Sequence, residues 1–275
     1  MRRRAALAAV GCGGVGAGAT DAGDVHRVDV DDLAPALDTL VPAPDIALTA
    51  PALAPVGAPF FVALTAAAPL TATVTLTVAG QEHAVHLYRG RGSVALRASA
   101  AGPVALAVDG VARAPLVAGE RPRRELSGVL AGDELVWTDA ADVVVTGDIT
   151  VPAGATLTIA AGTRALLTDA ANVEVAGALR SGGTAAAPVL FTAVGTAWGG
   201  LRVMAGGDAE LDETWLLAGG GDATRAFGHS GSQPVVWVEA ARLVMRGGGV
   251  LDSPGKAFGA PGGGADAHGR AGRAL

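Results

Sequence analysis

Between residues 143 and 191 the sequence repeats short apolar pairs separated by turn-forming residues. The two members of each pair are two positions apart, and the first five pairs begin six to eight residues apart. Side chains at i and i+2 lie on one face of a strand, and these intervals are too short for an intervening helix. The pattern therefore predicts very short strands, each with two inward side chains. The pairs are Val143 and Val145, Ile149 and Val151, Leu157 and Ile159, Ala165 and Leu167, Val173 and Val175, and Val189 and Phe191.

The spacing of these strands is typical of a β-solenoid. A Val-x-Val-x-Gly motif occurs at 143–147 and returns thirty residues later at 173–177, which predicts that the chain revisits one structural position. Pro152 and Gly154 predict bends between strands, so that one three-sided coil takes slightly over twenty residues. At roughly 20 to 24 residues per coil, residues 126–258 would form about five or six coils.

Particular residues are expected to stabilise the corners and the first end of this solenoid. Asp169, Asn172 and Thr192 fall where strands meet turns, and their side chains are expected to hydrogen-bond the backbone of the bends. An open solenoid end exposes unpaired backbone groups. We therefore expect residues 134–142, which include Trp137, to cap the N-terminal end.

Residues 46–118 are predicted to form a separate domain of six or seven short alternating strands. Turn signals such as Gly80 and Gly102 separate the runs, and regular spacing of this kind is typical of a β-sandwich. An immunoglobulin-like sandwich without a disulfide is the expected fold. Residues 119–125, rich in Arg and Glu, are predicted to be a solvated linker to the solenoid.

One long uncharged stretch in this region has the hydropathy of a membrane-spanning segment. No charged residue occurs between residues 46 and 80. Four prolines interrupt it, and residues 73–78 alternate Thr with an aliphatic residue, which favours strands over a helix. The prolines are Pro51, Pro55, Pro59 and Pro69.

The N-terminus carries the pattern of an export signal. Three arginines precede an apolar run at residues 5–11, and Ala9-Val10-Gly11-Cys12 resembles a bacterial lipobox. In such a signal the cysteine thiol takes a diacylglycerol, and its freed amine becomes available for acylation. The resemblance implies a signal peptide within residues 1–19, lipidation at Cys12 and a polar linker over 20–45. A signal peptide of another type is the alternative.

Charge and cysteine content exclude several other classes of protein. The formal net charge is −6 and the only lysine is Lys256, so a surface that neutralises nucleic-acid phosphates is not expected. A single cysteine, Cys12, permits no intramolecular disulfide and no cysteine-based zinc site. The sequence predicts no cofactor and no metal site, and contact with a membrane only through the N-terminal lipid.

The strand-rich half resembles a known family. Residues 147–159, 173–179, 183–192 and 198–201 are similar to the entry coils of bacterial right-handed parallel β-helix repeat proteins. This resemblance covers about 75 residues and implies a right-handed parallel β-helix. Together with the sandwich predicted from strand spacing, the expected fold class is all-β, with an N-terminal immunoglobulin-like sandwich followed by the β-helix.

A second, shorter resemblance extends to larger proteins. Residues 228–235 and 252–257 are similar to segments of surface proteins in which a sandwich and a β-helix accompany a spore-coat-type kinase domain. No kinase signature occurs in this chain, which has neither His-Arg-Asp nor Asp-Phe-Gly. Residues 259–275 are a Gly/Ala-rich tail, expected to be disordered or the truncated end of a longer gene.

Five acidic residues near the middle of the solenoid are the main chemical candidates. Glu210 and Asp212 are predicted to share one strand face with Leu211 pointing inward between them. Paired carboxylates can act as acid and base or hold calcium; a solvated acidic strand face is the alternative. The set is Asp208, Glu210, Asp212, Glu213 and Asp222.

Other candidates for a site are weaker. His83 and His86 are three apart on a predicted strand and face opposite ways, so they cannot share a metal. His229 lies beside two serines in a Gly/Ser-rich segment without a partnered acid, which a loop between coils explains equally well. Any exposed tryptophan could stack on a sugar, although packing roles are commoner. The tryptophans are Trp137, Trp198, Trp215 and Trp237.

These patterns together predict an exported, lipid-anchored bacterial envelope protein that acts as a structural or binding module toward glycans or surface proteins. One alternative is a polysaccharide lyase or hydrolase that uses Glu210 and Asp212. The other is a non-functional fragment of a larger multidomain surface protein.

Overall fold

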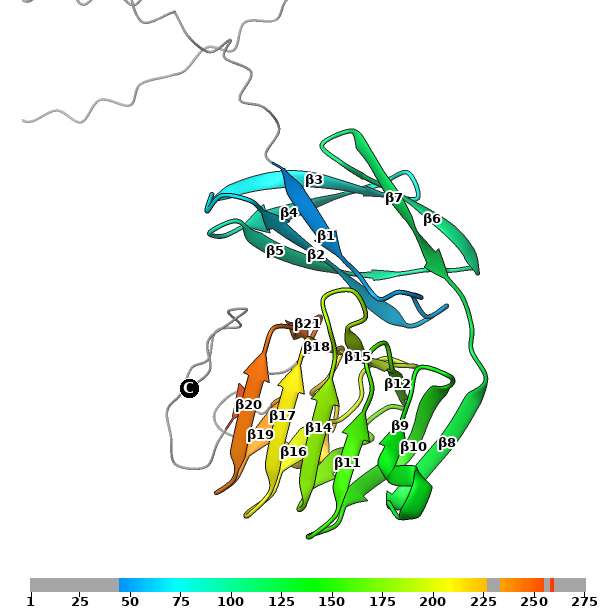
Figure 1. The fold of residues 1–275 in the computed structure, drawn as a ribbon, viewed down its shortest axis with the longest axis vertical. Coiled ribbons are helices and arrows are strands. Elements are labelled where there is room, and N and C mark those ends of the chain that lie inside the picture. The colour runs from blue at the N-terminus through cyan, green and yellow to red at the C-terminus, as the bar shows by residue number, and fades with distance from the viewer. Residues whose placement is uncertain (1–44, 227–232, 255–257, 260–275) are drawn as a thin grey trace, which may run out of the picture. The chain divides into compact units, whose positions relative to one another are not determined.

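Strands and loops make up nearly all of the computed structural model, which describes residues 45–226, 233–254 and 258–259. Within these ranges the only helical segments are two 3₁₀ turns, η2 (Gly132–Leu135) and η3 (Ala223–Arg225). The described chain is therefore all-β, as the sequence predicts (Figure 1).

The N-terminal strands form two antiparallel sheets. One sheet has the order β1-β2-β5 and the other β4-β3-β6-β7. Alternation in β3 buries Val74, Leu76 and Val78, because alternate side chains of a strand point to opposite faces. The bounds are β1 (Ile46–Thr49), β2 (Pro59–Ala66), β3 (Ala72–Val78), β4 (Gln81–Leu87), β5 (Arg91–Arg97), β6 (Gly102–Val108) and β7 (Val111–Ala118).

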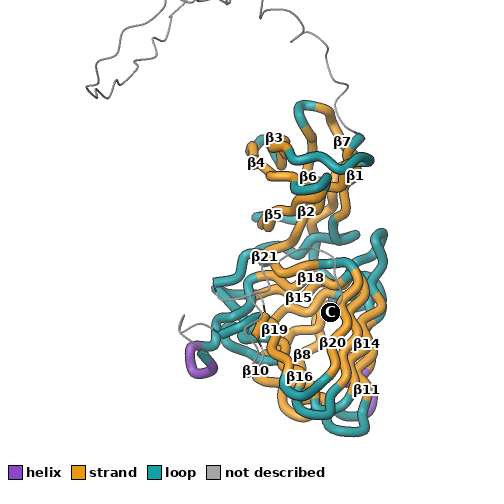
Figure 2. The backbone as a smooth tube through the Cα atoms, turned by 90° about the vertical axis from the view of Figure 1, so that its left-hand side faces the viewer, coloured by secondary structure: helices purple, strands orange, loops and turns teal. Residues whose placement is uncertain are grey.

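The following strands form a curled parallel arrangement of successive coils, compatible with a solenoid (Figures 1 and 2). We call its three stacks of strands the first, second and third columns. The first contains the start of β8 (Arg123–Val129), the start of β10 (Asp142–Val151), β12 (Arg164–Leu167), β15 (Val189–Ala193), β18 (Thr214–Leu217) and β21 (Gly249–Leu251). The end of β8 pairs with the end of β10 and so belongs to the second column. The second contains the end of β10, β13 (Val173–Val175), β16 (Leu201–Val203), β19 (Val236–Val238) and β22 (Phe258–Gly259). The third contains β9 (Val136–Trp137), β11 (Thr156–Ile159), β14 (Ala178–Gly182), β17 (Asp208–Asp212) and β20 (Arg242–Arg246).

The predicted inward pairs form the core of these coils. All twelve side chains of the six pairs are at most 2% exposed, and they belong to one hydrophobic cluster. Trp137 lies in the same cluster, and its indole Nε1 donates a hydrogen bond to Glu134 O at 2.9 Å. The prediction of paired inward side chains is confirmed, and four of the pairs lie on separate strands of three to five residues. The prediction of one very short strand per pair is wrong for Val143/Val145 and Ile149/Val151, which share the ten-residue strand β10.

The Val-x-Val-x-Gly repeat does not mark one structural position, and that prediction is wrong. Val143 pairs with Ala165 in the first column, whereas Val173 pairs with Ile149 in the second. These first coils repeat after 22 and 24 residues, from 143 to 165 and from 149 to 173. Because thirty residues exceed the length of one coil, the second copy of the motif lies on a different side of the next coil from the first copy.

The later coils are longer than the predicted 20 to 24 residues. Leu201 pairs with Val236, which is a step of 35 residues from 201 to 236. The additional length lies in the segment between β18 and β19, where η3 is found. Pairing between coils fixes the positions of the strand residues only. The segments that connect the strands at the corners can therefore be longer without disrupting the stacked strands.

The segment expected to be a linker at 119–125 is partly incorporated into the parallel sheet. Strand β8 begins at Arg123 and pairs in parallel with β10. The side chain of Arg121 donates from Nη1 to Gly162 O at 2.8 Å. These pairings supply hydrogen-bond partners to the edge of β10, which a solvated linker would leave open.

The antiparallel strands and the coils share buried contacts. The rings of Phe61 in β2 and Trp215 in β18 are stacked, with centroids 4.0 Å apart and an interplanar angle of 12°. Thr192 Oγ1 donates to Pro59 O at 2.8 Å instead of to a bend of its own coil. The Asp169 and Asn172 side chains do bond at bends, to Thr196 N and Ala170 O.

Candidate functional site

Of the five acidic residues singled out from the sequence, four lie at two places in the fold, and Glu213 directly follows the end of β17. Asp208, Glu210 and Asp212 lie on the outward face of β17, and Leu211 between the last two is fully buried. The predicted arrangement of Glu210, Leu211 and Asp212 is thus observed. Asp222 lies apart from them, at the start of η3.

Arginines from neighbouring strands neutralise the outward face of the third column. Asp208 is paired with Arg180 of β14 and with Arg242 of β20, the latter at 2.8 Å. Glu210 Oε1 lies 2.7 Å from Arg242 Nη1, and Asp212 Oδ1 lies 3.0 Å from Arg246 Nη1. We refer to these six residues as the ion-pair ladder.

The contacts with arginine favour the charged form of Asp208 and Glu210. The hydrogen bond from Arg242 lowers the pKa of Glu210 and is also the largest cause of the lowered pKa of Asp208. A general acid near neutral pH needs a raised pKa instead. The ladder is arranged for charge neutralisation, and an acid–base role for Glu210 and Asp212 remains a prediction.

A second group of polar residues lies on the outward side of the second column. Glu174, Arg202 and Trp237 occupy equivalent outward positions in β13, β16 and β19, since Glu174 pairs with Arg202 and Arg202 with Trp237. Their neighbours Val175 and Val203 point inward and are fully buried. Alternation within the short strands therefore determines which side chains are displayed here.

The segment between β18 and β19 lies beside this outward face of the second column. Asp222 caps η3, with its carboxylate accepting from Thr224 N at 2.9 Å. Asn172 donates to Asp222 Oδ2 at 3.1 Å and accepts from Gln233 Nε2 at 2.7 Å. Gln233 in turn accepts from Asp222 N at 2.9 Å. This network attaches both ends of the segment to the coil.

Arg225 of η3 forms ion pairs with three carboxylates of this region. Its guanidinium pairs with Glu174, with Asp148 at 2.9 Å and with Asp222 at 3.2 Å. Burial alone would lower the pKa of Arg225, but the hydrogen bond with Glu174 and the three negative charges raise it. Burial likewise raises the pKa of Asp222, but hydrogen bonds from Thr224 and Asn172 bring it below its usual value. Arg225 and Asp222 are therefore held as ions.

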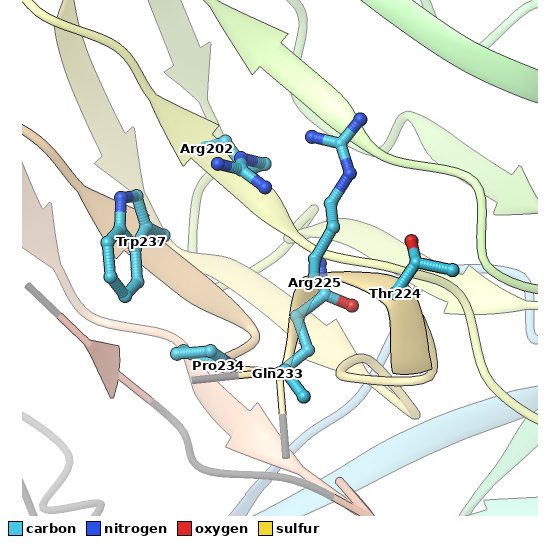
Figure 3. Close-up of a pocket in the computed structure, with 7 residues that line it drawn as sticks. Arg202, Thr224, Arg225, Gln233, Pro234 and Trp237 are labelled. Atoms are coloured by element: carbon cyan, nitrogen blue, oxygen red, sulfur yellow. The ribbon is translucent and has the colours of Figure 1, made fainter. Parts of the chain in front are cut away.

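A pocket of about 320 Å³ opens between η3 and the outward face of the second column. Figure 3 shows Arg202 between Trp237 on one side and Arg225 on the other, with Gln233 and Pro234 along the lower edge. The lining residues are Arg202, Thr224, Arg225, Ala226, Gln233, Pro234 and Trp237.

Trp237 differs from the other three tryptophans in its environment. Trp137, Trp198 and Trp215 are at most 6% exposed and pack in the core, whereas Trp237 is partly exposed and lines the pocket. A partly exposed indole beside polar groups is suited to stacking on the apolar face of a sugar ring.

Sequence reasoning named Trp237 but not Arg202, Thr224, Arg225 or Gln233. The outward positions of Arg202 and Trp237 can be read from the flanking inward pairs, Leu201 with Val203 and Val236 with Val238. The approach of η3 to that face depends on the path of a loop, for which the sequence has no periodic signal.

Several predicted features lie outside the described residues. Cys12, the signal peptide over 1–19, His229 with its two serines and most of the tail at 259–275 are among them. His83 and His86 lie in β4, and within the described ranges no group of three or more His, Cys, Asp or Glu is arranged to hold a metal ion. The same part of the chain contains no helix of the length and apolar character required to span a membrane.

None of the protein-family models, curated proteins or solved structures compared with this chain matches it.

Proposed function

We propose that this chain is an exported bacterial envelope protein that binds glycans through the pocket at Trp237. In this proposal an immunoglobulin-like sandwich spaces a right-handed parallel β-helix from the cell surface, to which a lipid on Cys12 anchors the protein. The observation that carries the proposal is the environment of Trp237, which, unlike the three buried tryptophans, is partly exposed and lines a pocket with polar walls.

Binding without cleavage fits the chemistry of the pocket. The nearby carboxylates of Asp148, Glu174 and Asp222 are ion-paired with Arg225. A general acid or base must instead be able to exchange a proton near the operating pH. The pocket thus offers an aromatic surface and hydrogen-bonding groups, which are the parts that a sugar-binding site needs.

Binding of the full chain to a panel of immobilised bacterial and plant polysaccharides tests this function. We expect the parent protein to be retained by at least one polysaccharide, and Trp237→Ala to lose about tenfold or more in affinity, since an aromatic anchor in a pocket contributes on this scale. Tyr88→Ala is the matched control, because Tyr88 is an exposed aromatic residue of the antiparallel part of the chain. Equal retention of the parent and Trp237→Ala would contradict the proposal.

The enzymatic alternative is tested on the same polysaccharides. If the chain is a lyase or hydrolase that uses Glu210 and Asp212, the parent protein releases oligosaccharides and Glu210→Gln with Asp212→Asn abolishes their release. Retained binding without any release by the parent would exclude it.

The envelope assignment has its own measurement. Expression in a bacterium with lipoprotein processing is expected to give a detergent-soluble product that begins at Cys12 and carries a diacylglycerol mass increment. Cys12→Ser should lack both. An unprocessed, water-soluble parent protein would overturn this part of the proposal.

A further inference from the structure

The pocket contains one positive charge that no carboxylate among the described residues neutralises. Two arginines line it, Arg202 and Arg225. Arg225 is neutralised by three carboxylates. Arg202 forms no ion pair with any residue in the described ranges, and its Nε is buried without a hydrogen-bond partner there.

The strands on either side of Arg202 explain why it has no ion pair with the described part of the chain. Glu174 is its register partner on the preceding strand, but Glu174 directs Oε1 to Arg225. On the following strand the register partner is Trp237, which has no carboxylate. A buried guanidinium nitrogen without an acceptor, such as Nε of the partly buried Arg202, is costly. A ligand that supplies an acceptor therefore removes this cost.

The other polar walls of the pocket are already engaged. Gln233 donates to Asn172 and accepts from Asp222 N, while the Thr224 hydroxyl donates to Asp222 Oδ1 at 2.6 Å. Among the described residues that line the pocket, Arg202 is therefore the charged donor that remains available to a ligand. A guanidinium group binds a carboxylate through two parallel hydrogen bonds, which makes it selective for planar oxyanions.

Resting on the proposed glycan-binding function, we infer that the ligand is an acidic glycan, and that the pocket holds a uronic acid residue. The carboxylate of the sugar lies against the guanidinium of Arg202, and the apolar face of its ring lies against Trp237. The two side chains are neighbours in register on adjacent strands, so one monosaccharide can contact both.

Calorimetric titration of the full chain with uronic acid oligosaccharides and their carboxyl-reduced counterparts tests this inference. Reduction replaces each carboxylate with a neutral hydroxymethyl group and keeps the ring. The probes are oligomers of galacturonate, glucuronate and mannuronate. We expect at least one acidic oligomer to bind, and its reduced form to bind about tenfold or more weakly because a charge-assisted bidentate contact is lost.

Variants assign the effect to Arg202. Arg202→Gln is expected to weaken binding of the acidic oligomer by a similar factor without changing binding of the reduced one, while Arg202→Lys retains part of the preference. Arg246→Gln, an arginine of the ion-pair ladder, is the control and should leave binding unchanged. Circular dichroism and the melting temperature establish that each variant is folded.

The possible results separate this inference from the function on which it rests. Equal binding of the acidic and reduced oligomers, with loss in Trp237→Ala, would overturn the acidic preference and leave glycan binding intact. Selective acidic binding that Arg202→Gln does not affect would also overturn it. If the parent protein bound only neutral polysaccharides, the acidic preference would likewise be overturned. If it bound no polysaccharide at all, the proposed glycan-binding function itself would be overturned.

Discussion

Arg164 and Asp142 form a buried bidentate ion pair at the junction between the antiparallel strands and the coils. Arg164 Nε lies 2.6 Å from Asp142 Oδ1 and Nη2 lies 2.7 Å from Oδ2, with the two side chains 1% and 4% exposed. The remaining nitrogen, Nη1, donates to Leu53 O at 3.0 Å and to Gly119 O at 2.9 Å. One guanidinium group therefore satisfies acceptors from three segments of the chain.

Replacement of Arg164 by Met is expected to destabilise the protein strongly. It leaves the Asp142 carboxylate and two carbonyl oxygens buried without partners, and breaking a buried pair in this way costs about 3–5 kcal/mol. Urea unfolding measures the loss. The double variant with Asp142→Leu should recover part of it, because the uncompensated charge is then removed. A single variant within about 1 kcal/mol of the parent would contradict this account.

The two glycines of the Val-x-Val-x-Gly repeat are expected to respond differently to substitution by alanine. A Cβ on Gly177 would lie 2.3 Å from Pro152 O and 2.4 Å from Ala155 O, both backbone atoms of the preceding coil. A Cβ on Gly147 would meet nothing closer than 3.9 Å. Overpacking of this kind costs roughly 1–3 kcal/mol, so Gly177→Ala should lower the urea midpoint, whereas Gly147→Ala should leave it nearly unchanged. Similar midpoints for the two variants would show that the backbone accommodates the methyl group.

Loss of Arg242 from the ion-pair ladder is expected to have a pH-dependent effect on stability. Hydrogen bonds from Arg242 lower the pKa of Asp208 and Glu210 in the folded protein. A lowered folded-state pKa stabilises the protein above the unfolded pKa, about 3.9 for Asp and 4.3 for Glu, and this contribution is lost as pH falls through the folded value. Arg242→Gln should therefore melt below the parent at neutral pH, and the difference should disappear in strong acid.

Salt and a second arginine provide the controls for the ladder. Because these side chains are partly exposed, 1 M NaCl should shrink the difference at neutral pH. Arg202→Gln removes an arginine without a carboxylate partner among the described residues, so its effect on melting should not follow the same pH dependence. A pH-independent effect of Arg242→Gln would contradict the electrostatic explanation.

Replacement of Asn172 by Ala is expected to release the segment that forms one wall of the pocket. Asn172 bonds to Asp148, Asp222 and Gln233, and each buried group left without a partner costs about 1–3 kcal/mol. Hydrogen exchange should accelerate at Asp222 N, which donates to Gln233. Thr184→Ala, which removes an exposed turn bond to Ala187 N, should leave that exchange unchanged.

The sequence by itself determined the strands and their inward faces. Pairs such as Leu157 with Ile159 and Val173 with Val175 are recognisable because the period of a strand is two and the buried face must be apolar. It also determined that Glu210 and Asp212 share an outward face with Leu211 buried between them. These features depend only on neighbours along the chain.

Only the tertiary structure decided which strands of successive coils pair with each other. This pairing determines which outward side chains are in contact. The motifs at 143–147 and 173–177 look equivalent, yet the coil length places them on different sides. The partnership of Arg242 with Asp208 and Glu210, and the isolation of Arg202 between Glu174 and Trp237, follow from register between coils. Register depends on the lengths of the corner segments, and those lengths vary without a periodic pattern because the stacked strands alone carry the core.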